Sequence, residues 1–195
     1  MPYSDKHKLI FVHIPKNAGT AITNTLEMID EGHHTYQYYQ NRYSERWKNY
    51  TKFCIVRNPW ERVVSCYEYA KLENSYWHSS DGGGKAGKHP DYELLKDKTF
   101  VECLEILNKT PNQLKHHGWA SQSQYVFNGD LTVNKVIPME KINEGLSELL
   151  KDNFVLPQIN VSNSNNYRDY YKTDEHINIV RRRYKIDIDL FNYEF

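Results

Sequence analysis

The chain has 195 residues, a length typical of one globular domain. Its 25 Lys and Arg residues balance 25 Asp and Glu residues, so the net charge at neutral pH is zero. A neutral chain argues against a general nucleic-acid coat and against a polybasic membrane binder, so any anion site must be local. We therefore expect one domain over residues 1–195, with no nucleic-acid or membrane partner.

The first part of the chain alternates short apolar segments with helical patterns. Residues 9–13 predict a buried strand, followed by a turn and by apolar side chains at helical intervals over residues 21–29. The polar stretch over residues 31–50 has no clear element. Residues 53–56 then predict a second buried strand, and a helix opened by Pro59 is expected to run to about Lys71.

The second part continues this alternation. Residues 74–93 are polar and Gly-rich, and we expect them to form a mobile insert. Helical spacing returns at residues 100–107, residues 135–138 predict a third strand, and residues 140–150 an amphipathic helix. Thr173 is suited to cap a C-terminal helix. Buried strands alternating with helices predict an α/β fold with a central parallel sheet flanked by helices on both faces.

The first candidate site is the segment from Pro15 to Thr20, between the first strand and its helix. Gly19 lets the backbone turn closely, the N–H groups of the helix start are expected to face a ligand, and Lys16 adds a cation. We interpret this segment as a phosphate cradle. It is not a GxxxxGK[ST] motif, because the Lys precedes the Gly; the alternative is a solvated Lys16 beside an ordinary turn.

The second candidate site begins at Arg57, at the carboxyl end of the second strand, which is the edge where open α/β sheets bind ligands. Arg57 and Ser65, about two helical turns later, predict a guanidinium and a hydroxyl for a second phosphate. The alternative is a solvated Arg57 and a Ser65 that faces its own helix. Glu61 and Arg62 are typical of charges on a solvated helix face.

Together, FVHIPKNAGT and FCIVRNPWERVVSCY resemble the two cofactor-binding signatures of the PAPS-dependent sulfotransferases. The likeness is to the carbohydrate-type branch, sulfotransferase family 2, which includes heparan and chondroitin sulfotransferases. Residues 32–35 resemble a Lys-His-x-Thr element of that branch, which sets His33 on its histidine, although Gly32 departs from its lysine. Residues 136–140 and the ending from Tyr167 resemble later blocks, and residues 74–130 are the weakest part.

The resemblance implies a P-loop-like sulfotransferase fold. It also implies an enzyme that transfers a sulfuryl group from PAPS to a hydroxyl or amine of a carbohydrate or small-molecule acceptor and releases PAP. It implies no metal. By motif, the following residues would bind the cofactor: Lys16, Asn17, Ala18, Gly19, Thr20 and Ala21 around the 5′-phosphosulfate, and Arg57 and Ser65 at the 3′-phosphate. The family usually has Ser where this chain has Ala21, which leaves a backbone N–H to serve there.

Catalysis then requires a cation and a base. Lys16 is placed to neutralise the charge that grows on the leaving oxygen. Histidine suits the base at neutral pH because its unperturbed pKa is about 6.5. His33 is the candidate, with His34 and His117 as alternatives, and His13 is expected to have a structural role behind the loop.

Other features have weaker interpretations. His116 and His117 precede Gln122 in a segment that fits either an acceptor-binding role or a surface loop. The sequence GGGKAGK over residues 82–88 satisfies GxxxxGK, but it lacks the following Ser or Thr and a preceding buried strand. The run over residues 181–183 fits a charged helix face or a contact with phosphate or a sulfated acceptor.

Two rival functions use the same features. A small nucleotide kinase also cradles phosphates, although no Ser or Thr follows a Gly-Lys pair and no strand ends in a magnesium-binding Asp. A non-enzymatic nucleotide-binding module would keep the loop without the base.

The cysteines bear on the compartment. Cys54, Cys66 and Cys103 are widely spaced and form no CxxC pair, so neither a disulfide framework nor a zinc site is indicated. The N-terminal apolar run, about six residues, is too short for a signal segment or a membrane span. We expect a cytoplasmic protein.

Overall fold

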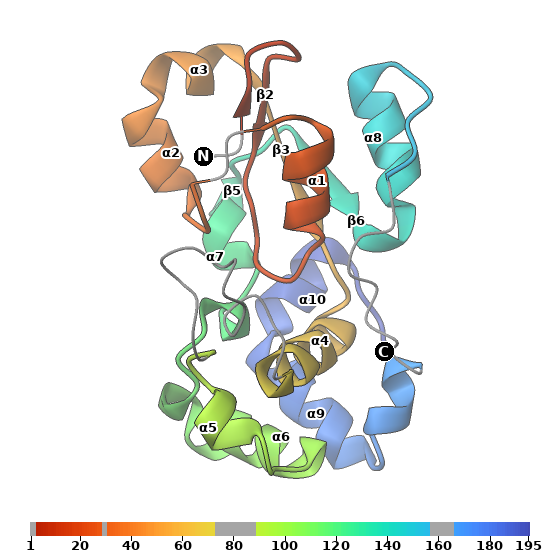
Figure 1. Cartoon of the computed structure of the whole chain (residues 1–195). Helices are drawn as coiled ribbons and strands as arrows, with labels where there is room; N and C mark the ends of the chain where they lie inside the picture. The colour runs from red at the N-terminus through yellow and green to blue at the C-terminus, as the bar shows by residue number, and fades with distance from the viewer. Residues whose placement is uncertain (1–2, 29–30, 73–88, 157–165) are drawn as a thin grey trace. The chain divides into compact units, whose positions relative to one another are not determined.

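A computed structural model describes residues 3–28, 31–72, 89–156 and 166–195 (Figure 1). The chain forms two compact units, and each is described by itself. Unit 1 comprises Met1–Arg57 and Ala120–Val161, and unit 2 comprises Asn58–Trp119 and Ser162–Phe195. The expectation of one domain over residues 1–195 stays a prediction.

Unit 1 is built on a four-stranded sheet in the order β1-β2-β3-β6. The strands parallel to one another are β2 (Leu9–Phe11), β3 (Thr51–Val56) and β6 (Lys135–Pro138). These are the strands that the sequence predicts, so the α/β class with a parallel sheet is confirmed. The short β1 (Tyr3–Ser4) was not predicted; it pairs antiparallel with β2 at the edge of the sheet.

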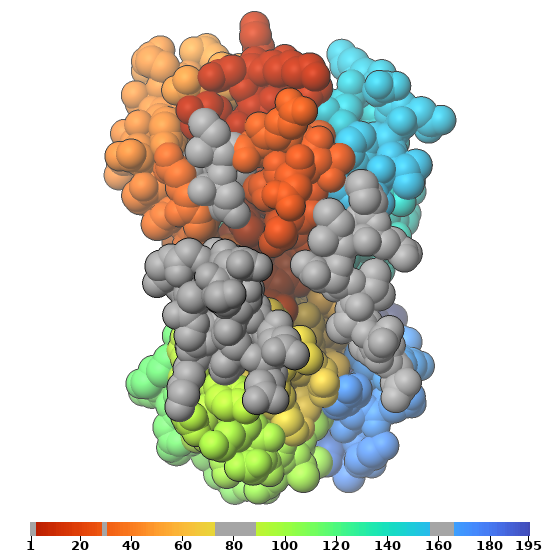
Figure 2. Space-filling view, viewed as in Figure 1, coloured from red at the N-terminus to blue at the C-terminus, as the bar shows by residue number. Residues whose placement is uncertain are grey.

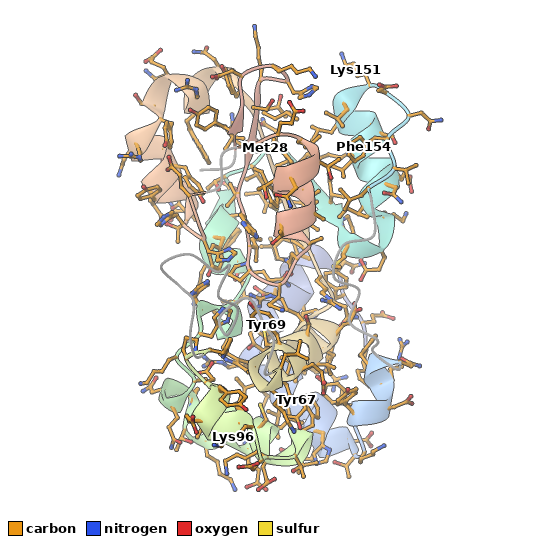
Figure 3. All side chains as sticks on the ribbon, in the orientation of Figure 1. Met28, Tyr67, Tyr69, Lys96, Lys151 and Phe154 are labelled. Atoms are coloured by element: carbon orange, nitrogen blue, oxygen red, sulfur yellow. The ribbon has the colours of Figure 1, made fainter. Side chains whose placement is uncertain are left out.

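The sheet is buried on both faces. On one face, Phe11, Phe53 and Ile137 pack with apolar side chains of α1 (Gly19–Thr25) and α8 (Ile142–Leu150). Met28 and Phe154, labelled in Figure 3, belong to the same cluster. Side chains alternate between the faces of a strand, so Ile10 and Cys54 point to the other face, where both are 0% exposed. Figure 2 shows the outer sides of α1 and α8 at the surface of unit 1.

The remaining elements of unit 1 are short. They are α2 (Tyr36–Arg42), α3 (Ser44–Asn49), α7 (Ser123–Val126), the β4–β5 hairpin (Phe127–Asn128 and Asp130–Leu131) and the 3-10 turn η4 (Met139–Lys141). The stretch over residues 31–50, for which the sequence indicated no element, therefore contains two helices. In α2, Tyr36 and Tyr39 lie one turn apart and are buried, so this helix has an apolar face made of side chains that also carry a hydroxyl.

Unit 2 is helical. Its elements are α4 (Pro59–Lys71), α5 (Tyr92–Leu95), α6 (Phe100–Lys109), α9 (Asp174–Arg183), α10 (Lys185–Phe191) and the 3-10 turns η2 (Pro111–Gln113), η3 (His117–Trp119) and η5 (Tyr167–Tyr170). Trp60 and Tyr67 of α4 pack with Leu104 of α6 and with Val180 of α9 in one apolar core; Tyr67 is labelled in Figure 3.

Caps fix the helix starts of unit 2. Asn58 accepts a hydrogen bond from Trp60 N at 3.0 Å, and Pro59 occupies the first turn of α4, as expected. Thr173 caps α9 by accepting from His176 N at 3.3 Å, which confirms that prediction. The GGGKAGK sequence and most of the expected insert lie outside the described residues. Across the described ranges, none of the helices combines the length and the apolar character that a membrane crossing requires.

Candidate functional site

The loop between β2 and α1 has an alternating backbone. Lys16 (φ 69°) and Ala18 (φ 56°) are left-handed, and Asn17 between them is not. Alternation of this kind turns successive N–H groups toward one side and forms a concavity that binds anions. Ala18 is also the N-cap of α1 and has no polar side chain, so it does not compete for the first N–H groups of the helix. This geometry allows the loop to present backbone donors to an anion, and the phosphate cradle stays a prediction.

Gly19 is required by a neighbouring ring rather than by its own backbone. A Cβ added to Gly19 would lie 1.6 Å from His13 Nε2. His13 lies two residues after the end of β2 and is 5% exposed. Its ring stacks on Phe11 with a centroid distance of 5.4 Å. The imidazole of His13 thus lies against the start of α1, behind the loop where the sequence analysis expected it.

His33, the predicted base, contacts His13. The two rings meet edge to face with a centroid distance of 4.0 Å, and His33 Nδ1 lies 3.1 Å from the carbonyl oxygen of His13. A carbonyl oxygen only accepts, so Nδ1 carries the proton and donates it. The lone pair of the neutral ring is then on Nε2, the nitrogen that can accept a proton. The fold places His33 next to the residue that packs on Gly19.

The alternative bases lie in other surroundings. His34 stacks on Tyr38 with a centroid distance of 3.9 Å, and its Nε2 lies 3.2 Å from the carbonyl oxygen of Glu31. His117 belongs to η3 in unit 2, where its ring lies 4.4 Å from that of His116. Of His33 and His34, the two candidates in unit 1, it is the ring of His33 that contacts His13.

Asn17 links the loop to the sheet. Its side chain is 0% exposed, and its Nδ2 donates to the carbonyl oxygen of Ile55 at 2.8 Å and to Gln122 Oε1 at 2.7 Å. These bonds join the loop after β2 to Ile55 near the end of β3 and to Gln122. An interaction of Asn17 with a phosphosulfate would therefore use the backbone of this residue and not its amide.

Arg57, the last residue of the first stretch of unit 1, contacts the loop after β2. It follows β3 directly, is 8% exposed, and its Nη1 donates to the carbonyl oxygen of Lys16 at 3.3 Å. Its backbone is held by Gln122, whose Oε1 accepts from Arg57 N at 2.9 Å and whose Nε2 donates to Arg57 O at 2.8 Å. The ammonium-bearing Lys16 and the guanidinium of Arg57 are thus held in one region of unit 1.

The other predicted ligands differ in exposure. Thr20 is exposed in the first turn of α1, whereas Ala21 is 4% exposed and packs inward. Ser65 lies in α4 of unit 2 and is partly exposed, so its role stays a prediction. Arg62 is 2% exposed, and the interpretation of this residue as a charge on a solvated face is wrong.

Gln122 is the residue that sequence reasoning missed. The segment from His116 to Gln122 was expected to bind an acceptor or to form a surface loop, yet His116 is 6% exposed and Gln122 is 0% exposed. The amide of Gln122 is used on the backbone of Arg57 and on Asn17. A lone glutamine in a polar run gives no periodicity that would have indicated this burial.

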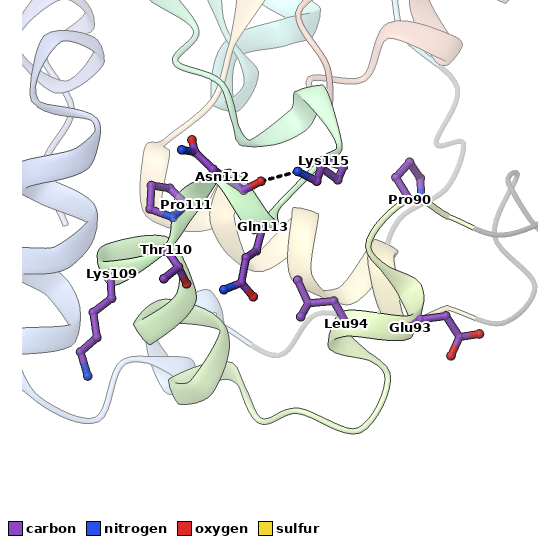
Figure 4. Close-up of a pocket in the computed structure, with 9 residues that line it drawn as sticks. All are labelled: Pro90, Glu93, Leu94, Lys109, Thr110, Pro111, Asn112, Gln113 and Lys115. Carbon is purple, nitrogen blue, oxygen red and sulfur yellow. Dashed lines mark hydrogen bonds between the residues drawn. The ribbon is translucent and has the colours of Figure 1, made fainter.

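Two surface hollows lie away from these residues, one in each unit. In unit 2, a depression of about 730 Å³ is lined by Pro90, Leu94, Lys109 and neighbouring residues, drawn in Figure 4. In unit 1, one of about 190 Å³ is lined by the β1 turn and the end of α1. Neither includes a predicted site residue. In the described part of the chain, no cluster of His, Cys, Asp and Glu is arranged to hold a metal ion.

In a comparison with known families, the model of a sulfotransferase family matches residues 1–194. Searches of curated proteins and of solved structures find no significant match.

Proposed function

Because the chain belongs to the sulfotransferase family, we propose that it transfers a sulfuryl group from PAPS to a hydroxyl of a carbohydrate or small-molecule acceptor. The match extends over residues 1–194, which supports sulfotransferase activity in general and agrees with the family inferred from the two motifs. The choice of PAPS as the sulfuryl donor rests on one observation, the hydrogen bond from the Arg57 guanidinium to the carbonyl oxygen of Lys16. This bond holds two cationic residues beside the loop with the alternating backbone.

The residues of this region fit a nucleotide with phosphate groups at both ends of its ribose. Lys16 and the backbone N–H groups of Ala18, Gly19 and Thr20 would hold the 5′-phosphosulfate. Arg57, which is 8% exposed and carries a planar guanidinium, would hold the 3′-phosphate. A role of Ser65 at this phosphate rests on the motif resemblance alone. When bound, PAPS supplies the activated sulfuryl group, and Lys16 counters the negative charge left on the phosphate side.

His33 would take the proton of the acceptor. Its Nδ1 donates to the carbonyl oxygen of His13, which fixes the orientation of the ring and leaves Nε2 as the basic atom.

A cytoplasmic location is part of this proposal. It is supported by Cys54, Cys66 and Cys103, which are all buried thiols and suit a reducing compartment.

Calorimetric titration with PAP, without magnesium, tests the donor. Wild-type protein should bind PAP, and Lys16→Ala should weaken binding by about tenfold or more, because a hydrogen bond to a charged group contributes about 1.5–3 kcal/mol. Lys8→Ala is the matched control: Lys8 also has a left-handed backbone (φ 51°) but is exposed outside this loop. A protein that binds ATP with magnesium and ignores PAP would contradict the proposal in favour of a kinase.

Transfer of labelled sulfate tests the base. His33→Ala should lower the turnover number by about 10²–10⁴-fold, the usual contribution of a general base, while PAP binding is retained. His34→Ala is the control, since its ring packs on Tyr38 rather than on His13. Full activity of His33→Ala together with a loss in His34→Ala would move the base to His34. Binding of PAP by a wild type that sulfates no acceptor would support a non-enzymatic module.

A further inference from the structure

Gln122 is a buried amide whose polar atoms are committed to the two predicted phosphate-binding segments. Its Oε1 accepts from Arg57 N at 2.9 Å and from Asn17 Nδ2 at 2.7 Å, which uses both lone pairs of the oxygen. Its Nε2 donates to Arg57 O at 2.8 Å. The residue is 0% exposed and lies 65 positions from Arg57 and 105 from Asn17 along the chain.

The amide acts like a neighbouring strand where the sheet stops. The β3–β6 ladder ends with Val56 opposite Pro138, and Arg57 is the next residue. Gln122 binds both the N–H and the C=O of Arg57, as a residue of an adjacent strand would do. The backbone of Arg57 is therefore fixed at two points although it lies outside the sheet.

The same amide closes a ring of hydrogen bonds. From Gln122 the contacts run to Asn17, along the chain to Lys16, from the Lys16 carbonyl to the guanidinium of Arg57, and back to Gln122. Asn17 also donates to Ile55 O at 2.8 Å, which ties the ring to β3. A shift of Gln122 would move both the loop and Arg57.

We propose that Gln122 is a positioning residue that sets the placement of Arg57 relative to the Lys16 loop, and thereby the selectivity for a nucleotide that carries a 3′-phosphate. This inference rests on the proposed function, because it takes Arg57 as the 3′-phosphate ligand. A guanidinium held by hydrogen bonds in the free protein binds without reorganisation, so small displacements reduce affinity. Gln122 itself is too deeply buried to touch the nucleotide.

The test compares two ligands on one variant. Gln122→Met keeps the length of the side chain and removes its hydrogen bonds. Its dissociation constant for PAP should rise by about tenfold or more, whereas that for 5′-AMP, which lacks the 3′-phosphate, should change much less. In an Arg57→Ala background, Gln122→Met should have little further effect on the preference for PAP over 5′-AMP, since the positioned group is gone.

Gln124→Met is the matched control, because Gln124 lies two residues further on and is exposed. Circular dichroism and thermal melting establish that each variant is folded at the temperature of the titration. If Gln122→Met does not fold, Gln122→Glu replaces it, since the carboxyl group keeps an oxygen that can accept from Arg57 N and lacks the amide N–H that donates to Arg57 O.

The outcomes separate this inference from the proposed function. The inference is supported if wild type and Gln124→Met bind PAP equally well while the Gln122 variant has lost its preference for PAP over 5′-AMP. A folded Gln122 variant with the wild-type preference would overturn it and leave the PAPS proposal intact. A wild type that does not bind PAP would overturn both.

Discussion

Ala18 has a left-handed backbone, with φ 56° and ψ 19°, without being a glycine. This conformation costs a residue with a Cβ roughly 1–2 kcal/mol. Glycine relieves the strain but loses about 0.4–1 kcal/mol through the greater freedom of the unfolded chain. Ala18→Gly should therefore raise the free energy of unfolding by about 0.5–1 kcal/mol, measured by chemical denaturation.

Ala21→Gly supplies the control for this prediction. Ala21 lies within α1 and is 4% exposed, so glycine there loses helix propensity, about 1 kcal/mol, and a buried methyl group. The two substitutions should change the free energy of unfolding in opposite directions. A loss of stability in both would show that the backbone of Ala18 is not strained in the folded protein.

The site could be predicted from the sequence where a residue follows a strand. Lys16 and Arg57 were found in this way, because parallel strands end at one edge of a sheet, where ligands bind. Gly19 was expected on the ground of a tight turn, but the structure gives the ring of His13 as the reason. Gln122 was not predictable, since its partners lie far away in the sequence and burial of one amide leaves no pattern.

At the level of elements, the parallel strands were predicted because each is an unbroken apolar run buried on both faces, as Phe53 and Cys54 illustrate. The helices α2 and α3 were not predicted. The buried positions of α2 are tyrosines such as Tyr39, whose hydroxyl donates to Gly32 O at 3.2 Å, and a hydrophobicity pattern gives too little weight to an aromatic ring that carries a hydroxyl. None of the residues of α3 is buried, so this helix has no apolar face that a pattern could show.

The N-terminus of α6 has a capping box that responds to pH. Glu102 accepts hydrogen bonds from the backbone N–H and the hydroxyl of Thr99, and these bonds lower the pKa of Glu102 from its ordinary value of 4.5. A carboxyl with a lowered folded pKa stabilises the protein above its unfolded pKa, and this contribution is lost as the pH falls through the folded pKa. Glu102→Gln should thus lower the melting temperature at neutral pH but not in acid.

Glu105→Gln is the control on the same helix. Glu105 is exposed and pairs with Lys109 at 3.4 Å, and a surface pair of this kind contributes about 0.3–0.5 kcal/mol. The melting temperature of Glu105→Gln at neutral pH should stay near that of wild type. An equal loss for Glu102→Gln at neutral and acidic pH would contradict the role of the ionised carboxylate.

For the whole molecule, a net charge of zero does not preclude an anion site. Lys16 and Arg57 supply the positive charge at the proposed PAPS site. Arg57 is buried there and forms hydrogen bonds with backbone and amide groups. Other charges are paired on the surface, as in Arg182 with Glu175 at 2.7 Å. Net charge thus bears on a general affinity for polyanions but says nothing about a site built from few residues.

The cysteines report on unfolding in each unit. Cys54 lies in β3 of unit 1, and Cys66 and Cys103 lie in the core of unit 2. Burial raises the pKa of Cys103 to about 12 and that of Cys54 well above its ordinary value. Thiolates are the reactive form, so a thiol reagent such as DTNB should leave the native protein unmodified and should titrate all 3 thiols in denaturant.

The same reagent tests the expectation of one domain. Each unit is made of two stretches of chain, and the stretches of unit 1 are joined through Asn58–Trp119 of unit 2. Unfolding of unit 2 would turn that connection into a flexible loop and raise the entropic cost of keeping unit 1 closed. We therefore expect one cooperative transition, with all thiols becoming reactive over the same range of denaturant concentration. Variants that retain only Cys54 or only Cys103 assign each reaction to a unit, and two separate ranges would establish two independently unfolding domains.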